Sequence, residues 1–378
     1  MGYIVTNHDF THGELDKSLF ARSDLTYYNK GARICKNLVV MPGGGVRSRF
    51  GTKQDMNIGE LPFDTTAAYQ MFSWVTGYYN YLIIISTEFT DGLIVYEVDA
   101  GTVNTFDNPF SGVVENRNIS GAQNQDEYVI CDENVEPYVF TSDETTGAVT
   151  FAEYIFKNPP TYDYFNNYDD WTFQLSDAAV TVGTAYSTLT CTAGTDWPGL
   201  TDNYVGGVFE AIGPTTGTTI GRARIITVDV AAQTAELQVI SAFDTGLTAV
   251  GGVPGSQVYI APTAYNDDRG WPKCVTFFED RLLFAGGGGV PQTLFFSATG
   301  DFRDFDPATG LDSDPIAYTI ASGAQDSIQN LVSGRSLQVF TSSSEMASPV
   351  WGTTALTPST ISIKAQTTNG SYGVQPTI

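Results

Sequence analysis

Short apolar runs joined by tight polar turns recur along this 378-residue chain and constrain its fold more than any other feature. Each unit places two apolar strands around a polar turn and usually adds a third strand. Thr, Gly, Val, Tyr and Phe are abundant while Leu is sparse, which favours pleated strands over helices. The expected strands are 69–75, 81–86 and 93–98; 119–122, 128–131 and 138–141; 274–278, 282–285 and 293–297; 328–332 and 337–341. The chain is therefore predicted to be mainly β.

Repeated strand–turn–strand units are typical of the blades of a β-propeller. An ordinary meander in a β-sandwich is the alternative, and four loose repeats are compatible with both. We expect a propeller-like body formed by residues 65–157 and 266–378. The repeat is interrupted over 158–265, which opens with Pro159-Pro160 and continues as short separate strands. This segment is predicted to be an inserted small β-barrel or sandwich module.

The first 64 residues differ from this pattern and are predicted to form a short helical and loop segment. Apolar residues between 15 and 29 partly follow helical spacing, with Asp24 as a possible N-cap. A short apolar strand is expected over 38–41. The following Pro42-Gly43-Gly44-Gly45 predicts a turn with unusual backbone angles.

Charge is distributed unevenly along the chain. Residues 1–53 hold eight of the 18 Lys and Arg residues against four acids, a net charge of +4. The other 325 residues hold ten bases against 38 acids, a net charge of −28. The total of −24 argues against an ordinary nucleic-acid-binding surface, because neutralising phosphates requires Lys and Arg. Two interpretations stay open: a solvated acidic surface that maintains solubility, or a surface that faces a polyanion without binding it.

Residues that carry metal, redox or triad chemistry are few and scattered. The four cysteines, Cys35, Cys131, Cys191 and Cys274, form no CxxC pair. Both histidines lie within the first twelve residues, so a histidine base for a catalytic triad is not expected. We expect no structural zinc, no disulfide framework and no cofactor. Gly286–Gly289 lacks the Lys-Ser/Thr of a phosphate loop and is predicted to be a hairpin connection.

Pairs of acids raise the possibility of glycoside hydrolysis, which uses two carboxylates at a set separation. These pairs are Asp169-Asp170, Asp267-Asp268, Asp304 with Asp306, and Asp312 with Asp314. A sialidase-like propeller would also need an arginine cluster, and the ten bases after residue 53 are dispersed. We therefore expect no enzymatic activity. A tail-borne glycan-binding or glycan-degrading propeller is kept as the alternative function.

The basic opening segment has two interpretations. Aromatic residues lie among its bases, as in proteins that bind single-stranded nucleic acids. Acids also lie among them, which equally suits a subunit contact with ion pairs, and we favour the contact surface. The residues expected to make it are Glu14, Arg22, Asp24, Tyr27, Tyr28, Arg33, Arg47 and Arg49. No signal peptide opens the chain, and its longest apolar stretch, 78–86, is too short to span a membrane.

The same opening segment resembles the start of the tail nozzle proteins of short-tailed bacteriophages, also called tail tubular protein B or stabilisation proteins. The resemblance resumes later in the chain, and it covers roughly 1–155 and 265–378. Near the start it is carried by Gly13-Glu14-Leu15, Leu19, Arg22-Ser23-Asp24-Leu25, Tyr27-Tyr28, Gly31-Ala32-Arg33, Asn37, Gly43-Gly44-Gly45-Val46, Arg49 and Gly51-Thr52. Later it is carried by Gly270-Trp271-Pro272, Phe277-Phe278-Glu279-Asp280-Arg281-Leu282, Phe284-Ala285-Gly286, Gly300-Asp301-Phe302, Phe340-Thr341 with Glu345, and Asn369-Gly370-Ser371.

The resemblance implies a structural protein of the virion tail, assembled in the cytoplasm of the bacterial host. Its subunits would form a homohexameric nozzle ring that contacts the tail adaptor below the portal and anchors tail fibres. The ring would close the channel before infection and conduct viral DNA, without specific binding, during ejection. Members of the family continue into further strands, so the chain is expected to continue beyond residue 378.

Overall fold

The computed structural model describes residues 9–20, 22–49, 51, 69–86, 92–111, 119–162, 172–175, 186–192, 199–212, 219–243, 257–306, 310–321, 326–349 and 356–376. The chain divides into two compact units, Met1–Leu61 and Pro62–Ile378, and each is described by itself. Over the described residues the regular structure is almost entirely β-strand, with three short 3₁₀ turns and no α-helix. None of these described elements is a helix long and apolar enough to cross a membrane. The predicted mainly β fold is confirmed.

The N-terminal unit contains two 3₁₀ turns and one hairpin. The turns are η1 (Lys17–Leu19) and η2 (Tyr28–Lys30), and the hairpin strands are β1 (Leu38–Val40) and β2 (Val46–Ser48). The strand expected at 38–41 and the glycine turn after it are confirmed, and Gly44 has the left-handed φ of 89°.

The helix suggested for residues 15–29 is wrong. The Asp16 carboxylate accepts hydrogen bonds from the Ser18 backbone N–H (2.7 Å) and hydroxyl (2.5 Å), which cap a single turn. Phe20 then takes an extended backbone, and the turn ends. Short polar side chains of this kind compete with the helical backbone for hydrogen bonds.

The larger unit contains four four-stranded antiparallel meanders, named here sheets 1 to 4, in which each strand pairs with the next along the chain. Sheet 1 is β3 (Gln70–Val75), β4 (Asn80–Ile85), β5 (Leu93–Glu97) and β6 (Thr102–Phe106). Sheet 2 is β7 (Ser120–Asn124), β8 (Glu127–Asp132), β9 (Val135–Ser142) and β10 (Val149–Glu153). Sheet 3 is β17 (Cys274–Phe278), β18 (Arg281–Ala285), β19 (Thr293–Phe296) and β20 (Ile316–Thr319). Sheet 4 is β21 (Ile328–Ser333), β22 (Leu337–Thr341), β23 (Glu345–Ala347) and β24 (Lys364–Thr367).

These sheets coincide with the four predicted repeats, and every predicted strand pair in them is present. The fourth strand of each sheet was not predicted, and neither was β23, the third strand of sheet 4. β6 and β24 show why, because most of their positions are exposed and polar, as in Lys-Ala-Gln-Thr of β24. An outer strand with little apolar surface leaves no hydrophobic period to detect.

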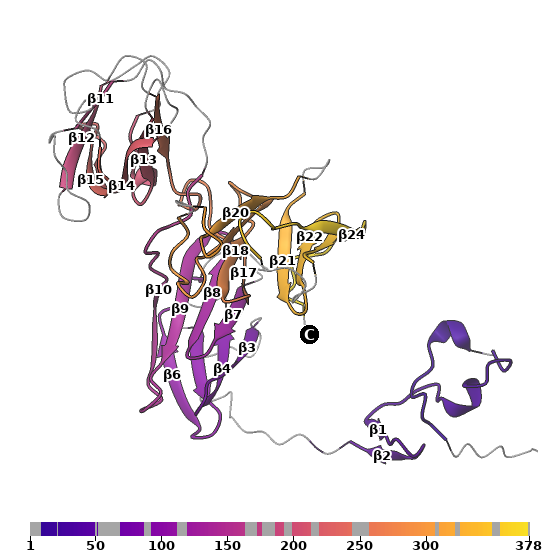
Figure 1. Cartoon of the computed structure of the whole chain (residues 1–378). Coiled ribbons are helices and arrows are strands. Elements are labelled where there is room, and N and C mark those ends of the chain that lie inside the picture. The colour runs from indigo at the N-terminus through magenta and orange to yellow at the C-terminus, as the bar shows by residue number, and fades with distance from the viewer. Residues whose placement is uncertain are drawn as a thin grey trace, which may run out of the picture. The chain divides into compact units, whose positions relative to one another are not determined.

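Three buried clusters join the sheets in chain order. Sheets 1 and 2 share a cluster that includes Trp74 and Phe140. Sheets 2 and 3 share one that includes Val129 and Phe284, and sheets 3 and 4 share a third around Leu283 and Val339. The first strands also meet, because β17 contacts both β7 and β21. Successive meanders therefore pack face to face, with purple β3–β10 and orange to yellow β17–β24 forming neighbouring parts of this unit (Figure 1).

A separate six-stranded antiparallel sheet lies between sheets 2 and 3 in sequence, named here the inserted sheet. Its strands are β11 (Thr172–Leu175), β12 (Tyr186–Thr192), β13 (Val208–Ile212), β14 (Thr219–Asp229), β15 (Thr234–Ser241) and β16 (Gln257–Ala261). The spatial order is β11-β12-β15-β14-β13-β16. The expected barrel or sandwich is thus a single sheet over the described residues, and its end strands β11 and β16 are not paired with each other there. The chain enters and leaves it side by side, since Thr161 and Thr263 form an antiparallel bridge.

Candidate assembly surfaces

The N-terminal unit buries little apolar surface. Among its described residues Leu15 is the one buried large apolar side chain, at 9% exposure. A Cβ at Gly31 would lie 2.5 Å from Leu15 Cγ, so the glycine allows this packing. Its exposed large apolar residues are Ile34 (61%), Leu38 (41%), Val39 (37%), Met41 (38%) and Val46 (38%). Clustered exposed apolar side chains mark surfaces that bind another protein.

The residues expected to form the assembly contact occupy several places on this unit. Arg22 and Asp24 form a bidentate ion pair, with 2.8 Å from Nε to Oδ1 and 2.7 Å from NH2 to Oδ2. Both side chains are more than half exposed. The Tyr27 ring stacks on His12 with centroids 5.6 Å apart, while Tyr28 begins the turn η2.

The other predicted contact residues support the fold of the unit or lie on the hairpin. Glu14 pairs with Ala32 in a parallel bridge, and its carboxylate accepts the Cys35 backbone N–H at 2.8 Å. The Arg33 guanidinium lies 5.4 Å from the Phe20 ring centroid. Arg47 stands opposite Val39 on the hairpin, and Arg49 donates its backbone N–H to the Asn37 carbonyl. The exposed Val39 and Arg47 therefore share one face, which combines apolar and basic character.

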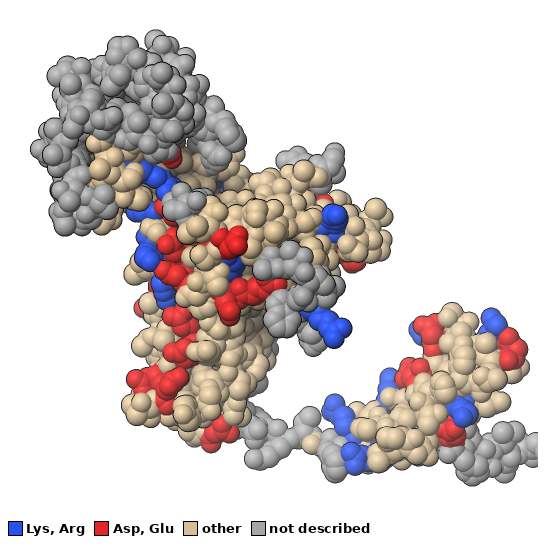
Figure 2. Space-filling view, in the orientation of Figure 1, with Lys and Arg blue, Asp and Glu red and all other residues tan. Residues whose placement is uncertain are grey.

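Sheets 1 and 2 carry only one sign of charge. The described residues of 69–156 include eleven acids and no Lys or Arg. The acids are Glu97, Asp99, Asp107, Asp126, Glu127, Asp132, Glu133, Glu136, Asp143, Glu144 and Glu153. On the face drawn in Figure 2, the lower end of the larger unit shows red patches without blue.

The inserted sheet is tied to the body by an ion cluster at its root. Arg222 holds Asp306 with two hydrogen bonds, of 3.1 Å from NH1 and 2.6 Å from NH2. Arg224 NH2 lies 3.4 Å from the same carboxylate, and its NH1 donates to the Gly206 carbonyl. The side chains of Arg222, Arg224 and Asp306 are only 15%, 7% and 8% exposed. Burial lowers the pKa of Arg224, against the opposing effect of Asp306.

This cluster uses every base of the insertion, because Arg222 and Arg224 are the sole Lys or Arg residues between 158 and 265. The sequence signal was an Arg-Ala-Arg alternation on one strand, which places both guanidinium groups on one face. Their partner lies 84 residues away from Arg222, and nothing local in the sequence identifies it. Charges buried in this way are paired because an unpaired one is costly.

The later motif pieces of the family resemblance meet in space. A Cβ at Gly287 would lie 2.4 Å from the Trp271 carbonyl oxygen, and one at Gly289 would lie 2.8 Å from Arg269 Cβ. The glycine run therefore connects β18 to β19, as predicted, and also packs closely on the segment around Trp271. Arg281 is 1% exposed, and its guanidinium donates to three carbonyls, of Ser297, Asp312 and Asp314.

A buried aspartate clamps the turn between β22 and β23. Asp326 is 2% exposed and accepts hydrogen bonds from the hydroxyls of Thr341, Ser342 and Ser344 and from the Ser343 backbone N–H. Burial alone would raise the pKa of Asp326, but these hydrogen bonds outweigh it and leave the pKa below its ordinary value. The side chain is therefore charged and satisfied at neutral pH.

The acids considered for glycoside hydrolysis have structural contacts where they are described. Asp306 binds the two arginines, and Asp304 accepts the Asp306 backbone N–H. Asp267 and Asp268 accept from Trp271 Nε1 and from the Asn203 side chain. Asp314 accepts the Leu311 backbone N–H, and Asp312 is exposed. Asp169 and Asp170 lie outside the described residues.

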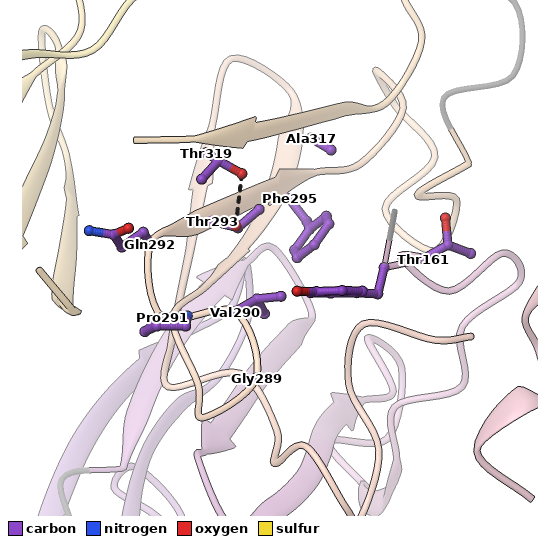
Figure 3. A pocket seen from close by; sticks show the side chains of 10 residues that line it. Thr161, Gly289, Val290, Pro291, Gln292, Thr293, Phe295, Ala317 and Thr319 are labelled. Carbon is purple, nitrogen blue, oxygen red and sulfur yellow. Dashed lines mark hydrogen bonds between the residues drawn. The ribbon is translucent and has the colours of Figure 1, made fainter. Parts of the chain in front are cut away.

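An open cavity of about 360 Å³ lies where the inserted sheet leaves the body. Its lining is uncharged and consists of Thr161, Tyr162, Gly289, Val290, Pro291, Gln292, Thr293, Phe295, Ala317 and Thr319 (Figure 3). Thr293 and Thr319 are joined by a hydroxyl hydrogen bond of 3.0 Å. The Arg269 guanidinium lies 4.3 Å from the Tyr162 ring centroid. Aromatic rings and hydroxyls without charge suit a neutral polar ligand.

Two of the described cysteines are buried, and Cys35 is partly exposed. Cys131 and Cys274 are buried free thiols, and burial raises the pKa of Cys274 to about 12. Such thiols are poor nucleophiles at neutral pH. Over the ranges given above, no group of three or more His, Cys, Asp or Glu side chains is placed to hold a metal ion.

No protein-family model matches this chain, and no curated protein matches it. The resemblance to tail nozzle proteins therefore rests on the sequence motifs described above.

Proposed function

We propose that this protein is a structural subunit of the tail of a short-tailed bacteriophage, where it forms the nozzle ring. The N-terminal unit carries the proposal. It contains the motifs of the resemblance and exposes large apolar side chains to water. It has one buried large apolar residue and five exposed ones among the residues described. A unit this small gains stability when a partner covers such a surface.

The body supports the proposal through its repeated architecture. Four meanders packed face to face, with β17 between β7 and β21, suit the blades of a propeller-like body, the finer fold that we propose. Each inter-sheet cluster is buried and apolar, so the body is a rigid block. A rigid block is what a wall around a DNA channel requires, and the inserted sheet adds a projecting surface to which tail fibres could bind.

Acidic charge suits the passage of DNA. Sheets 1 and 2 have no Lys or Arg over their described residues. A channel wall of this charge would repel phosphates and let the genome slide, whereas a wall of basic groups would bind the phosphates and hold the genome back. In this proposal the partners are five further copies, the tail adaptor, tail fibres and passing DNA. The role needs neither catalysis nor a cofactor.

Imaging of the purified protein by electron microscopy, together with its native mass, tests the proposal. A closed ring of about six subunits is expected from the family resemblance, and head-to-tail contacts between identical chains form such a ring when the rotation between neighbours closes. Acidic residues should line the lumen of that ring. A monomer under all assembly conditions, or a ring with a basic lumen, would contradict the proposed role.

A glycan-binding role is the second candidate, and the uncharged cavity beside Tyr162 favours it. A glycan array probed with the full chain distinguishes the two. Binding that disappears on Thr293→Val and Thr319→Val substitution, in a protein that stays monomeric or trimeric, would support the glycan-binding alternative. A closed ring without glycan binding supports the nozzle.

A further inference from the structure

Four hairpin turns of sheets 1 and 2 lie at one end of the body. They are the turns 76–79, 98–101, 125–126 and 143–148, named here the turn-end surface. Tyr79 Oη donates to the Thr145 carbonyl at 3.3 Å, which joins the first turn to the last. Trp74 Nε1 lies 3.4 Å from the Gln125 carbonyl. In the same way, Val98 N donates to the Asn80 carbonyl at 2.8 Å. The four turns therefore form one continuous surface.

Large apolar side chains are exposed on this surface. Val75 is 52% exposed, Tyr78 is 74% exposed and Val98 is 46% exposed. The core of the body does not include these three side chains, because inward residues of β3 such as Trp74 already fill the cluster between sheets 1 and 2. An apolar patch at the tips of hairpins is the kind of surface that a partner covers.

Acids surround these apolar residues. Asp99, Asp126, Asp143 and Glu144 lie on the same turns, and no Lys or Arg occurs among the described residues of sheets 1 and 2. Hydrogen bonds from the Thr146 and Thr145 backbone N–H groups and the Thr146 hydroxyl lower the pKa of Asp143, so it is charged at neutral pH. The surface thus selects a partner that is both apolar and basic.

The chain contains such a partner in its own sequence. Residues 1–53 carry a net charge of +4 in a protein of −24. Within them, exposed Val39 and Arg47 share one face of the β1–β2 hairpin, and exposed Met41 follows β1 directly. Exposed Leu38 and Val46 lie on the opposite face of the same hairpin. Two different patches on identical chains make a head-to-tail contact, and such contacts generate a ring when the rotation between neighbours closes.

We propose that the turn-end surface of one copy is the docking site for the N-terminal unit of a second copy. This inference rests on the proposed ring function and deepens it by naming the surface that receives the contact. Apolar side chains supply the buried area, while the opposite charges orient the two copies and suppress wrong pairings. The contact repeats around the ring.

Charge reversal on each side tests the docking site. One variant carries Asp126→Lys and Glu144→Lys, a second carries Arg47→Glu and Arg49→Glu, and a third carries all four. Each of the first two should assemble at least tenfold more weakly than the natural chain, and the third should recover much of the loss. Asp202→Lys with Asp312→Lys, two exposed acids outside the surface, is the control and should assemble normally. Circular dichroism and native mass establish folding and assembly for every variant.

Cross-linking then separates contacts between copies from contacts within one. Light and heavy-isotope chains are mixed, assembled and treated with a carbodiimide that joins carboxylates to lysines. Mixed-isotope links from Asp126 or Glu144 to Lys30, Lys36 or Lys53 support the proposal. Links found only within single chains overturn it in favour of docking on the same copy. Normal rings from both reversed variants overturn the docking site and leave the ring function standing. Monomers from the natural chain overturn both.

Discussion

Two arginine–aspartate pairs in this protein share a bidentate geometry and lie in opposite surroundings. Arg22 and Asp24, in the N-terminal unit, are 55% and 61% exposed. Arg222 and Asp306, at the root of the inserted sheet, are 15% and 8% exposed. Water screens the first pair, which therefore adds little to folding. The second pair is desolvated, so loss of one partner strands a buried charge. The same geometry therefore adds little to folding where the pair is exposed and fixes a joint where the pair is buried.

The largest expected effect comes from breaking the buried joint. Asp306→Ala removes the carboxylate shared by two buried guanidinium groups and leaves only Glu210, 3.8 Å from Arg222 Nε. It should cost about 3–5 kcal/mol of unfolding free energy. Urea unfolding followed by tryptophan fluorescence, with proteolysis of the inserted sheet as a second readout, measures it. The combined variant Arg222→Met, Arg224→Met, Asp306→Leu should recover most of the loss, because apolar replacement removes the stranded charge. Equal destabilisation by the combined variant would argue against this explanation.

A smaller effect is expected at the clamp of sheet 4. Asp326→Ala leaves the hydroxyls of Thr341, Ser342 and Ser344 and the Ser343 backbone N–H without their acceptor. The expected cost is about 1–3 kcal/mol, the usual penalty for unsatisfied buried polar groups. Chemical denaturation detects it, with the exposed Asp312→Ala as the matched control. A cost no larger than that of the control would show that water replaces the carboxylate.

Acid should weaken the same clamp. The pKa of Asp326 is lower in the folded protein than its ordinary value, so the unfolded chain binds its proton first as the pH falls. The stabilisation is complete above an ordinary aspartate pKa of about 3.9 and is lost as the pH falls through the lower folded value. Unfolding free energies measured from pH 6 to pH 3 should decline less steeply in Asp326→Asn than in the natural chain. Parallel curves for the two proteins would show that Asp326 does not contribute to the loss of stability in acid.

The smallest effect on stability is expected at the exposed pair. Arg22→Ala and Asp24→Ala should leave the thermal midpoint of the protein within experimental error, because both side chains face water. If the pair belongs to the assembly contact, the same substitutions weaken ring formation at low protein concentration. Analytical ultracentrifugation at two ionic strengths tests this separation of assembly from folding. A lower thermal midpoint without any change in assembly would show that the exposed pair stabilises the fold and takes no part in assembly.

Sequence periodicity predicted the body well because apolar strands such as 282–285 alternate with turns that have strong local signals. Glu279 and Asp280 both take left-handed backbone angles in such a turn, which suits a two-residue hairpin. Outer strands such as β24 were missed because exposed polar residues carry no hydrophobic period. The helix over 15–29 was wrong because a local Asp16–Ser18 cap outweighed the apolar spacing.

The candidate surfaces were only partly predictable. Charge counting found the basic opening segment, and the motifs singled out Arg22, Asp24 and Arg49. The partners of Arg222 and Asp326 could not be predicted, because their contacts join residues 84 and up to 18 positions apart through the folded chain. The exposed apolar residues Leu38 and Val46 looked like ordinary strand residues, and their exposure became evident only in the structure.

The central claim is that the N-terminal unit assembles a ring that the body alone does not form. Native mass spectrometry of the full chain and of a variant lacking residues 1–53 tests it most directly. We expect a closed oligomer of about six subunits for the full chain and a folded, β-rich monomer for the variant, because the variant lacks one side of the head-to-tail contact. Equal oligomers from both proteins would contradict the claim.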